Sequence, residues 1–471
     1  MLHVSTRGEA PPLGFTEAML AGLARDGGLY VPERWPSLSF DEIAGFAGLP
    51  YAEVAMAVLG RLVEGEVPAP VLDRAIEESY AAFRHPAVCP LVQIGDNLFV
   101  LELFHGPTLA FKDVAMQLLG RLMDYALKAR GGRATIVGAT SGDTGSAAVE
   151  AFSGLGQVDV FILFPHGRVS EVQRRQMTSV DAPNVHALAV EGTFDDCQAL
   201  VKALFNHARF RDELQLSGVN SINWARVAAQ GVYFFTAAAT LGAPHRPVSF
   251  SVPTGNFGDV LAGFVAKRMG LPVERLMVAT NANDILPRTV ATGRYEVQAV
   301  SPTTSPSMDI QISSNFERLL FEIHGRDGFA VRRHMQSLAQ SGAFTIAPEP
   351  LARMREEFGS QAVPEPDVLS EIAAVWREAG YLIDPHTAIG TRAARTLLRD
   401  DPRTPVVALA TAHPAKFPDA VEEACGVRPA LPPHLADLMD RPERFAVVPN
   451  EPAAVERHIR ARSRAVRGEA A

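Results

Sequence analysis

The sequence predicts an α/β protein with doubly wound parallel sheets, a helical N-terminal segment and a C-terminal extension. Short apolar runs alternate with helical stretches from about residue 90 to about residue 410, a pattern typical of parallel strands covered by helices. Residues 1–85 instead have apolar positions at helical spacing throughout. A charged, proline-rich segment begins at about residue 429. These three observations predict an enzyme-like body with an addition at each end.

The elements are expected in a definite order along the chain. The N-terminal helices should be FTEAMLAGLARDGG, FDEIAGFAG, YAEVAMAVLGRLVEG and VLDRAIEESYAAF. The strands should be LFVLELF, ATIVGA, VDVFILFP, VHALAV, VSFSVP, VERLMVAT and VVALATA. Among the helices between them are DVAMQLLGRLMDYALKA, FDDCQALVKALFNHA and GDVLAGFVAKRMG, and a helix is expected over about residues 386–398.

Composition excludes several classes of protein. The length of 471 residues suits two or three domains at about 150 residues each. The net charge of −9 counts against a general binder of nucleic acid or of anionic membranes. Cys89, Cys197 and Cys425 lie far apart and form no metal-ligand or redox pair, which suits a reducing cytosol. With no secretory signal pattern and no apolar run of about 20 residues, we expect a cytoplasmic protein.

Three loops that each follow an apolar strand are candidate binding sites, because open parallel sheets bind ligands at this edge. They are residues 140–145 (TSGDTG), 254–258 (TGNFG) and 411–413 (TAH). Glycines allow the backbone to close around a phosphate, and free N–H groups at a helix start bind anions. Each loop alone is also compatible with an ordinary strand-to-helix turn. Because none has a dinucleotide or Walker pattern, we expect a small phosphorylated cofactor or substrate.

Lys112 is the candidate for amine chemistry. The chain has only five lysines: Lys112, Lys128, Lys202, Lys267 and Lys416. Lys112 is flanked by apolar residues in TLAFKDVAM, and partial desolvation lowers the pKa of an amine and makes it a nucleophile. The alternative is a surface lysine with a buried stem, but the start of a helix disfavours a cation. Lys416, after His413 and Pro414, is the only competitor.

Several motifs together resemble the threonine synthase family. They are STRG…LARDGGLYVP at the start, HGPTLAFKD, SGDTG, NSINWARV, PTGNFGD, SMDIQISSNFERLLFE, DPHTAIG and TAHPAKF. The resemblance runs in the right order from about residue 2 to beyond residue 425, and its length is similar to the larger bacterial and fungal form. It implies the pyridoxal-phosphate-dependent fold type II, that of the tryptophan-synthase β chain. We therefore expect a helical domain over 1–90, a smaller α/β domain over 91–240, a larger one over 241–428 and an extension over 429–471.

The resemblance also implies where the cofactor, pyridoxal 5'-phosphate, is held. Lys112 would carry it covalently, and Thr411 would place its hydroxyl against the pyridine nitrogen. A neutral partner there makes the ring a weaker electron sink than an aspartate would. The cofactor phosphate would be cradled by the backbone N–H groups of Gly255, Asn256, Phe257 and Gly258.

The implied substrate is O-phospho-L-homoserine, converted with water to L-threonine and phosphate in the last step of threonine biosynthesis. Ser141, Asp143 and Thr144 would receive its amino-acid part. Close relatives have asparagine at the position of Asp143, and an ionised aspartate can only accept hydrogen bonds. Asn223 and Arg226 are candidates for the substrate phosphate, because a guanidinium binds phosphate with two parallel hydrogen bonds. The alternative for Arg226 is a salt bridge on a helix.

Other interpretations of the chain were considered. His386 and His413 are expected to be structural, and Asp384 to cap a turn. A dehydratase of the same fold would release ammonia from serine or threonine, and a related lyase would act on a different phospho-amino acid. A catalytically silent relative would have no need of Lys112. We expect a small-molecule enzyme that acts as a monomer or homodimer and binds neither nucleic acid, nor membranes, nor a catalytic metal.

Overall fold

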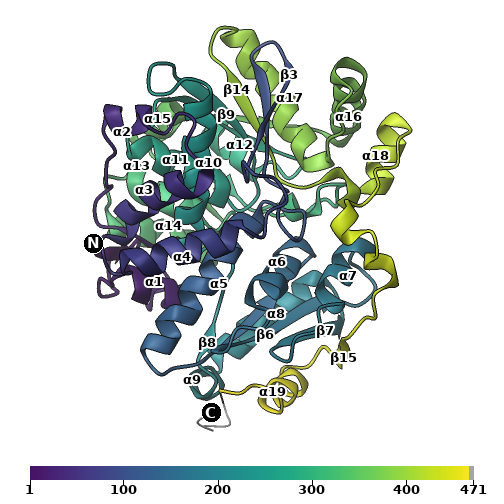
Figure 1. Cartoon of the computed structure of the whole chain (residues 1–471). Helices are drawn as coiled ribbons and strands as arrows, with labels where there is room; N and C mark the ends of the chain where they lie inside the picture. Colours follow the sequence, from purple (N-terminus) through teal and green to yellow (C-terminus); the bar gives the residue numbers. More distant parts are fainter. Residues whose placement is uncertain (466–471) are drawn as a thin grey trace.

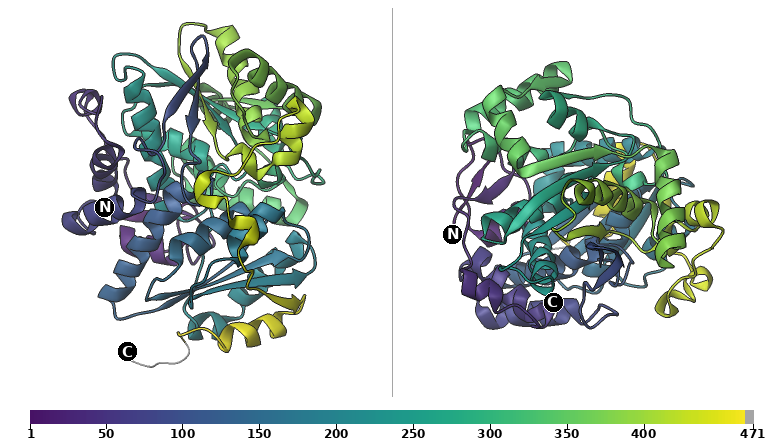
Figure 2. Two further views of the ribbon diagram at one scale, coloured as in Figure 1. Left: turned by 45° about the vertical axis from the view of Figure 1, so that its right-hand side comes forward. Right: turned by 90° about the horizontal axis from the view of Figure 1, so that it is seen from above.

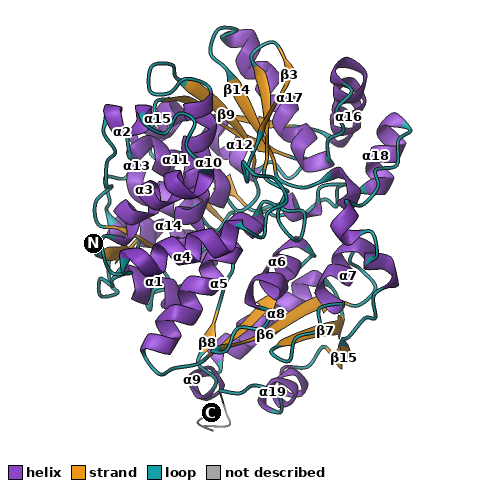
Figure 3. Ribbon diagram, in the orientation of Figure 1, coloured by secondary structure: helices purple, strands orange, loops and turns teal. Residues whose placement is uncertain are grey.

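A computed structural model describes residues 1–465, and its strands form two main sheets, seen as separate groups in Figure 3. The larger has six strands, and all neighbouring strands are parallel except β3 and β4. In sheet order they are β13 (Phe358–Ala362), β10 (Val273–Thr280), β9 (Val248–Pro253), β14 (Val406–Ala410), β4 (Leu98–Glu102) and β3 (Leu91–Gly95).

The smaller sheet has five strands, and each is parallel to its neighbours. In sheet order they are β15 (Ala446–Pro449), β7 (Val185–Glu191), β6 (Val158–Pro165), β5 (Ala134–Ala139) and β8 (Leu216–Ser217). All eight residues of β6 are buried, as expected for a central strand covered on both faces.

Helices cover both faces of the larger sheet, and β14 shows how the sequence divides between them. Alternate side chains of a strand point to opposite faces. Val406 and Ala408 pack in a cluster with α17 (Pro385–Asp400), whereas Val407 and Leu409 join the main core, which includes α10 (Trp224–Thr240) and α11 (Gly258–Arg268). The remaining helices and strands of this half are α12 (Ile285–Thr292), β11 (Arg294–Glu296), η1 (Pro306–Met308), α13 (Phe316–Ile323), α14 (Gly328–Ser341), β12 (Ala343–Thr345), α15 (Pro348–Glu357), α16 (Glu365–Ala379), η2 (Pro414–Lys416) and α18 (Pro418–Cys425).

The smaller sheet lies beneath this half, next to its own helices (Figure 1). These are α5 (Lys112–Ala129), α6 (Asp143–Phe152), α7 (Glu171–Thr178), α8 (Phe194–Asn206) and α9 (Ala208–Glu213). Helix α5 packs against α6, α4 and α10, so it connects the N-terminal segment with both halves. Lys112 is its first residue.

The N-terminal segment packs on α10 and α5 rather than forming an independent unit. It contains β1 (His3–Ser5), α1 (Phe15–Ala21), β2 (Tyr30–Pro32), α2 (Phe40–Ala44), α3 (Tyr51–Val63) and α4 (Ala69–Tyr80). Helix α3 contacts α10, and α4 contacts α5. The rings of Tyr51 and Tyr80 meet edge to face at 4.7 Å between centroids.

The C-terminal segment runs from the larger half to the far edge of the smaller sheet, and both views of Figure 2 show this yellow segment. After η3 (Pro433–Leu435) and η4 (Leu438–Asp440), β15 pairs with β7, and α19 (Pro452–Arg460) follows. Val455 and Ile459 of α19 belong to the same buried cluster as Leu188 and Val190 of β7, and α19 contacts β15 and α8. The segment therefore completes the smaller half.

All the strands and helices named from the sequence are present, and most agree within a few residues at their ends. The exception is α1, which ends at Ala21 before Gly22 although it was expected to reach Gly28. The strand pairing nevertheless groups the chain differently from the expected segments at two points. Strands β3 and β4, within the segment 91–240 expected to form the smaller domain, belong to the six-stranded sheet. Strand β15, in the extension 429–471, belongs to the five-stranded sheet. Within residues 1–465, none of the helices combines the length and apolar character needed to cross a membrane.

Candidate active site

Lys112 lies where a loop from the larger sheet enters α5. The backbone N–H of Phe111 donates to the carbonyl of Thr411 at 2.9 Å, and Ala110 forms an antiparallel bridge with Ala412. These contacts bring the segment of Thr411, at the end of β14, next to that of Lys112. The Thr411 hydroxyl has no hydrogen-bond partner in the described chain. It is therefore free to bind a ligand.

The carboxylate of Asp143, at the start of α6, is the centre of a buried polar cluster. Its Oδ2 is 3.3 Å from Nζ of Lys112 and 3.4 Å from Oγ of Ser307. Its Oδ1 is 2.8 Å from Nζ of Lys416 and accepts a hydrogen bond from Nε2 of Gln173 at 2.7 Å. Asp143 and Lys416 are 3% and 0% exposed. The structure thus places both Lys112 and Lys416, the two candidates for the reactive amine, on the same carboxylate.

The charges of this cluster shift the pKa values of its members. Burial alone would raise the pKa of Asp143, but the ammonium groups of Lys416 and Lys112 hold it well below its usual range. Burial lowers the pKa of Lys112, Asp143 opposes this, and Lys416 and Arg226 add to it. A carboxylate that stays ionised and an amine that loses its proton more readily suit a lysine used as nucleophile and base.

The loop that leads into α11 presents free N–H groups. The backbone N–H groups of residues 255–258 have no hydrogen-bond partner in the described chain. The carbonyls of Gly255 and Asn256 accept hydrogen bonds from Ser313 Oγ at 2.7 Å and Asn315 N at 3.0 Å. Phe257 has a left-handed backbone (φ +62°) and is buried between Phe316 and Phe358, whose packing stabilises this uncommon conformation. Such free N–H groups at a helix start bind phosphate.

Arg226 is a buried cation without an anionic partner. It is 3% exposed, Nη1 donates to the carbonyl of Val219 at 3.1 Å, and Nε is buried without a partner. Burial lowers its pKa to about 10. Because Arg226 makes no ion pair with any described residue, the alternative of a helical salt bridge is wrong. A buried guanidinium without a counter-charge is a site for an anion.

Asn223 uses one donor and one acceptor of its amide within the protein. Its Oδ1 accepts from the backbone N–H of Ala225 at 3.1 Å and caps α10, while its Nδ2 donates to the carbonyl of Met19 at 2.8 Å. Both ends of the amide are used. One N–H of Nδ2 has no partner among the described residues, so the assignment of Asn223 to the substrate phosphate stays a prediction.

Ser141 and Thr144 flank Asp143 and are half-buried, and no described residue is hydrogen-bonded to either side chain. Two other residues cap helices. Asp384 caps α17 by accepting from the backbone N–H groups of His386 and Thr387, and Nδ1 of His413 accepts from the N–H of Ala415.

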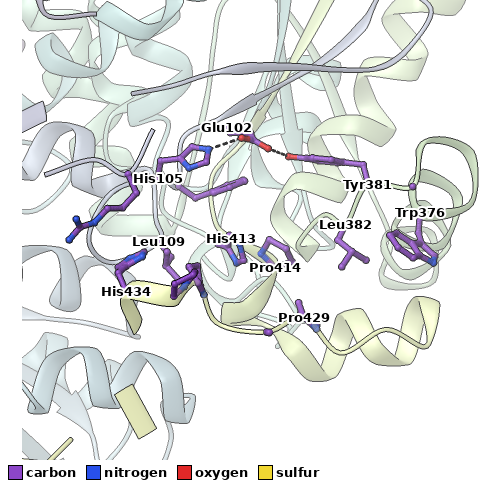
Figure 4. Close-up of a pocket in the computed structure, with 16 residues that line it drawn as sticks. Glu102, His105, Leu109, Trp376, Tyr381, Leu382, His413, Pro414, Pro429 and His434 are labelled. Atoms are coloured by element: carbon purple, nitrogen blue, oxygen red, sulfur yellow. Dashed lines mark hydrogen bonds and ion pairs between the residues drawn. The ribbon is translucent and has the colours of Figure 1, made fainter. Parts of the chain in front are cut away.

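A pocket of about 550 Å³ lies next to the site but is not lined by Lys112, Asp143 or Thr411. Figure 4 shows His413 and Leu109 on its wall, with Glu102 bonded to His105 and Tyr381. His413 N donates to the carbonyl of Leu109 at 3.1 Å. This hydrogen bond belongs to the same pair of segments that positions Thr411.

Comparison of the amino-acid sequence with known proteins identifies the family of this chain. A profile described as "Pyridoxal-phosphate dependent enzyme" matches residues 89–412, one for the "Threonine synthase N terminus" matches residues 2–80, and one for "Threonine synthase, C-terminal" matches residues 387–459. The threonine synthase of Pseudomonas aeruginosa is 54% identical over 98% of this chain and 98% of its own length. The chain belongs to the threonine synthase family. Its fold is therefore the predicted fold type II.

Solved structures of the threonine synthase family agree. The crystal structure of the PLP-bound enzyme from Brucella melitensis is 62% identical, with a TM-score of 0.96 over 98% of this chain and all of that one. The yeast enzyme is 39% identical, with a TM-score of 0.92 over 97% of this chain and 98% of that one. The cofactor of the family, pyridoxal phosphate, fits the residues present. Lys112 offers an amine, Thr411 a free hydroxyl, and residues 255–258 four unused N–H groups.

Sequence reasoning missed three contacts of the threonine synthase site: Lys416, Gln173 and Ser307 on Asp143. Lys416 had a signal, since a lysine directly after a loop at a strand end is expected near other loops of that edge. Gln173 and Ser307 had none, because nothing in their local sequence predicts a contact with α6.

Proposed function

We propose that this chain converts O-phospho-L-homoserine and water to L-threonine and phosphate, with the reaction centred on Lys112. The observation that carries the proposal is a surplus of positive charge around one buried carboxylate. Lys112, Lys416 and Arg226 bring three cationic side chains to this cluster, and within the described residues Asp143 is the carboxylate that forms ion pairs with the two lysines. Such a site needs anions, and a phosphorylated cofactor and a phosphorylated substrate would supply them.

The residues support distinct roles. When bound, pyridoxal phosphate supplies an electron-withdrawing ring that stabilises negative charge on the substrate carbon beside the amino group. The N–H groups of residues 255–258 would bind the cofactor phosphate, and Thr411 would donate its hydroxyl hydrogen to the pyridine nitrogen. Nζ of Lys112 would take a proton from the α-carbon of the substrate and then one from the β-carbon. Its hydrogen bond to Asp143 would hold Nζ in place for these transfers.

The substrate phosphate needs donors of its own before it leaves the γ-carbon. Arg226 would supply them, because its guanidinium has no counter-charge. Ser141 and Thr144 would hold the substrate carboxylate at the start of α6, where helix N–H groups favour an anion. Lys112 would then return protons while water adds at the β-carbon. The phosphate released balances the water consumed.

The assay compares two reactions on the purified chain loaded with cofactor. With O-phospho-L-homoserine we expect phosphate and threonine in equal amounts. With serine or threonine we expect no ammonia, which would be the product of a dehydratase. A Lys112→Ala variant should lose the visible absorption of the bound cofactor and fall in activity by about 1,000-fold or more. Ammonia from threonine, with no phosphate from O-phospho-L-homoserine, would overturn the proposal.

We further propose that the enzyme acts in the cytoplasm as a monomer or homodimer. Cys89, Cys197 and Cys425 are free thiols, which supports a reducing compartment. Sedimentation of the loaded protein tests the assembly, and a mass above that of a dimer would contradict it. Fractionation of the source cells tests the compartment.

A further inference from the structure

Lys416 is a second buried lysine on the carboxylate that faces Lys112. Its Nζ is 2.8 Å from Oδ1 of Asp143 and donates to the carbonyl of Thr108 at 2.8 Å. Asp143 is the one carboxylate with which it forms an ion pair in the described chain. Lys112 lies on the other oxygen, at 3.3 Å. Each lysine thus contacts a different oxygen of the Asp143 carboxylate.

A buried ammonium at this place needs an explanation beyond stability. A buried ion pair is often no more stable than apolar residues of the same volume, and Lys416 is 0% exposed. Its second hydrogen bond holds the loop before α5, since Thr108 also binds Asp113 through N and Oγ1 at 2.7 Å each. Lys416 is therefore fixed from two sides, which makes it a rigid charge.

We propose that Lys416 is a positioning residue that holds Oδ1 of Asp143, so that Lys112 shares the carboxylate rather than forming a full ion pair with it and keeps an amine that readily loses its proton. The inference deepens the proposed function, because it assumes that the amine of Lys112 is the reactive group. It assigns Lys416 no contact with the substrate or the cofactor.

Charges from four elements face Lys112, and their signs make the inference testable. Asp143 raises its pKa, whereas Lys416 and Arg226 lower it. Asp259, the other acidic group that interacts with Lys112, is buried and has a raised pKa of about 7. His386 acts on Asp143 rather than on Lys112. Removal of Lys416 should therefore raise the pKa of Lys112, and removal of the Asp143 charge should lower it.

The experiment measures how readily Lys112 loses its proton. The full chain, freed of cofactor, is methylated with formaldehyde and a mild hydride donor at a series of pH values, and each lysine is followed by peptide mass spectrometry. A small aldehyde is needed because the Lys112 side chain is 10% exposed. Exposed Lys202, for which the described chain gives no ion pair, serves as the reference within each sample.

Four variants test the inference: two should change the labelling rate of Lys112 in opposite directions, and two should leave it near that of the wild type. Lys416→Met should slow the labelling of Lys112 at neutral pH by about tenfold, which corresponds to one pH unit. Asp143→Asn should accelerate it. The double variant Asp143→Asn/Lys416→Met should return to within about threefold of the wild type, and so should Lys416→Arg, because it keeps the charge. In the loaded protein, the pH midpoint of the visible absorption band should move in the same directions.

The outcomes separate this inference from the proposed function. If Lys416→Met and Asp143→Asn shift the profile in the same direction, or if Lys416→Met leaves it unchanged, Lys416 only holds the Thr108 loop and the inference is wrong. The double variant covers the case in which Lys416→Met fails to fold, because it removes the uncompensated carboxylate. Labelling uses no substrate, so it gives its answer whether or not the wild type forms threonine.

Discussion

The hydroxyl of Tyr233 in α10 donates a hydrogen bond to Oδ1 of Asp259 in α11, and both side chains are buried. The other oxygen of Asp259 is buried without a hydrogen-bond partner among residues 1–465. Burial raises the pKa of Asp259 to about 7, although Tyr233 and Lys112 oppose the shift. An acid directly after the 255–258 loop is thus favoured in its neutral form below about pH 7.

The raised pKa predicts a pH-dependent stability. The folded state holds the Asp259 proton at pH values where the unfolded chain has lost it, so the contribution of Asp259 to the free energy of unfolding falls from about pH 4 to about pH 7. Asp259→Asn keeps an acceptor for Tyr233 but cannot ionise. We expect the variant to be more stable than the wild type at pH 8 by roughly 1–3 kcal/mol, and no more stable at pH 4. Urea unfolding at both pH values measures this, and an equal difference at both would contradict it.

Arg226 predicts a selective effect on substrate binding. Arg226→Gln should raise the KM for O-phospho-L-homoserine by about 10- to 100-fold, because a charged hydrogen bond to a buried phosphate is lost. Cofactor affinity, from titration of the visible absorption, should stay within about threefold. Arg74→Gln, on an exposed arginine of α4, is the control and should change neither. Weaker cofactor binding with an unchanged KM would assign Arg226 to the cofactor instead.

The C-terminal segment predicts an effect on stability. Ile459 is 0% exposed and packs against the smaller sheet. Ile459→Ala should lower the free energy of unfolding by about 2–4 kcal/mol, through lost burial and the cavity left behind. Val447→Ala, at a side chain 49% exposed on β15, should cost less than about 0.5 kcal/mol. Circular dichroism during urea unfolding reports both, and equal losses would show that α19 packs loosely.

Local sequence patterns predicted the elements but not their partners. Strands such as β6 and β14 are short apolar runs between helices, so their type follows from length and composition. That β4 pairs with β14, and β15 with β7, depends on contacts between distant segments. No local pattern encodes which sheet a strand joins, and the expected domain segments could not show it.

In the candidate site, too, local sequence predicted individual residues but not the contacts between distant segments. Lys112 and Thr411 were predicted, and the structure brings them together. The contact of Lys416 with Asp143 was not predicted, because it joins loops from the two halves. For Asn223 the sequence also held a second signal: asparagine is a preferred residue directly before a helix, where it caps the helix, and the structure shows that cap.

A substitution at Gly142 tests how far stability and activity depend on the position of the Asp143 side chain. Its φ is +146°, and a Cβ there would lie 2.3 Å from Cδ of Gln173, whose amide holds Asp143. Gly142→Ala should therefore displace Gln173 and cost about 2–4 kcal/mol of stability, with a fall in kcat. Gly154→Ala, also at positive φ but with no atom within 4 Å of its Cβ, should cost only about 1 kcal/mol and leave kcat unchanged.

The double variant Gly142→Ala/Gln173→Ala separates the clash from the backbone strain. With the amide gone, the new Cβ has space, so part of the stability lost in Gly142→Ala should return. Activity should not return, because Asp143 has lost the Gln173 amide, one of its two donors at Oδ1. Recovery of full activity would mean that Gln173 is a space-filling neighbour and that Lys416 and Lys112 alone hold the carboxylate in place.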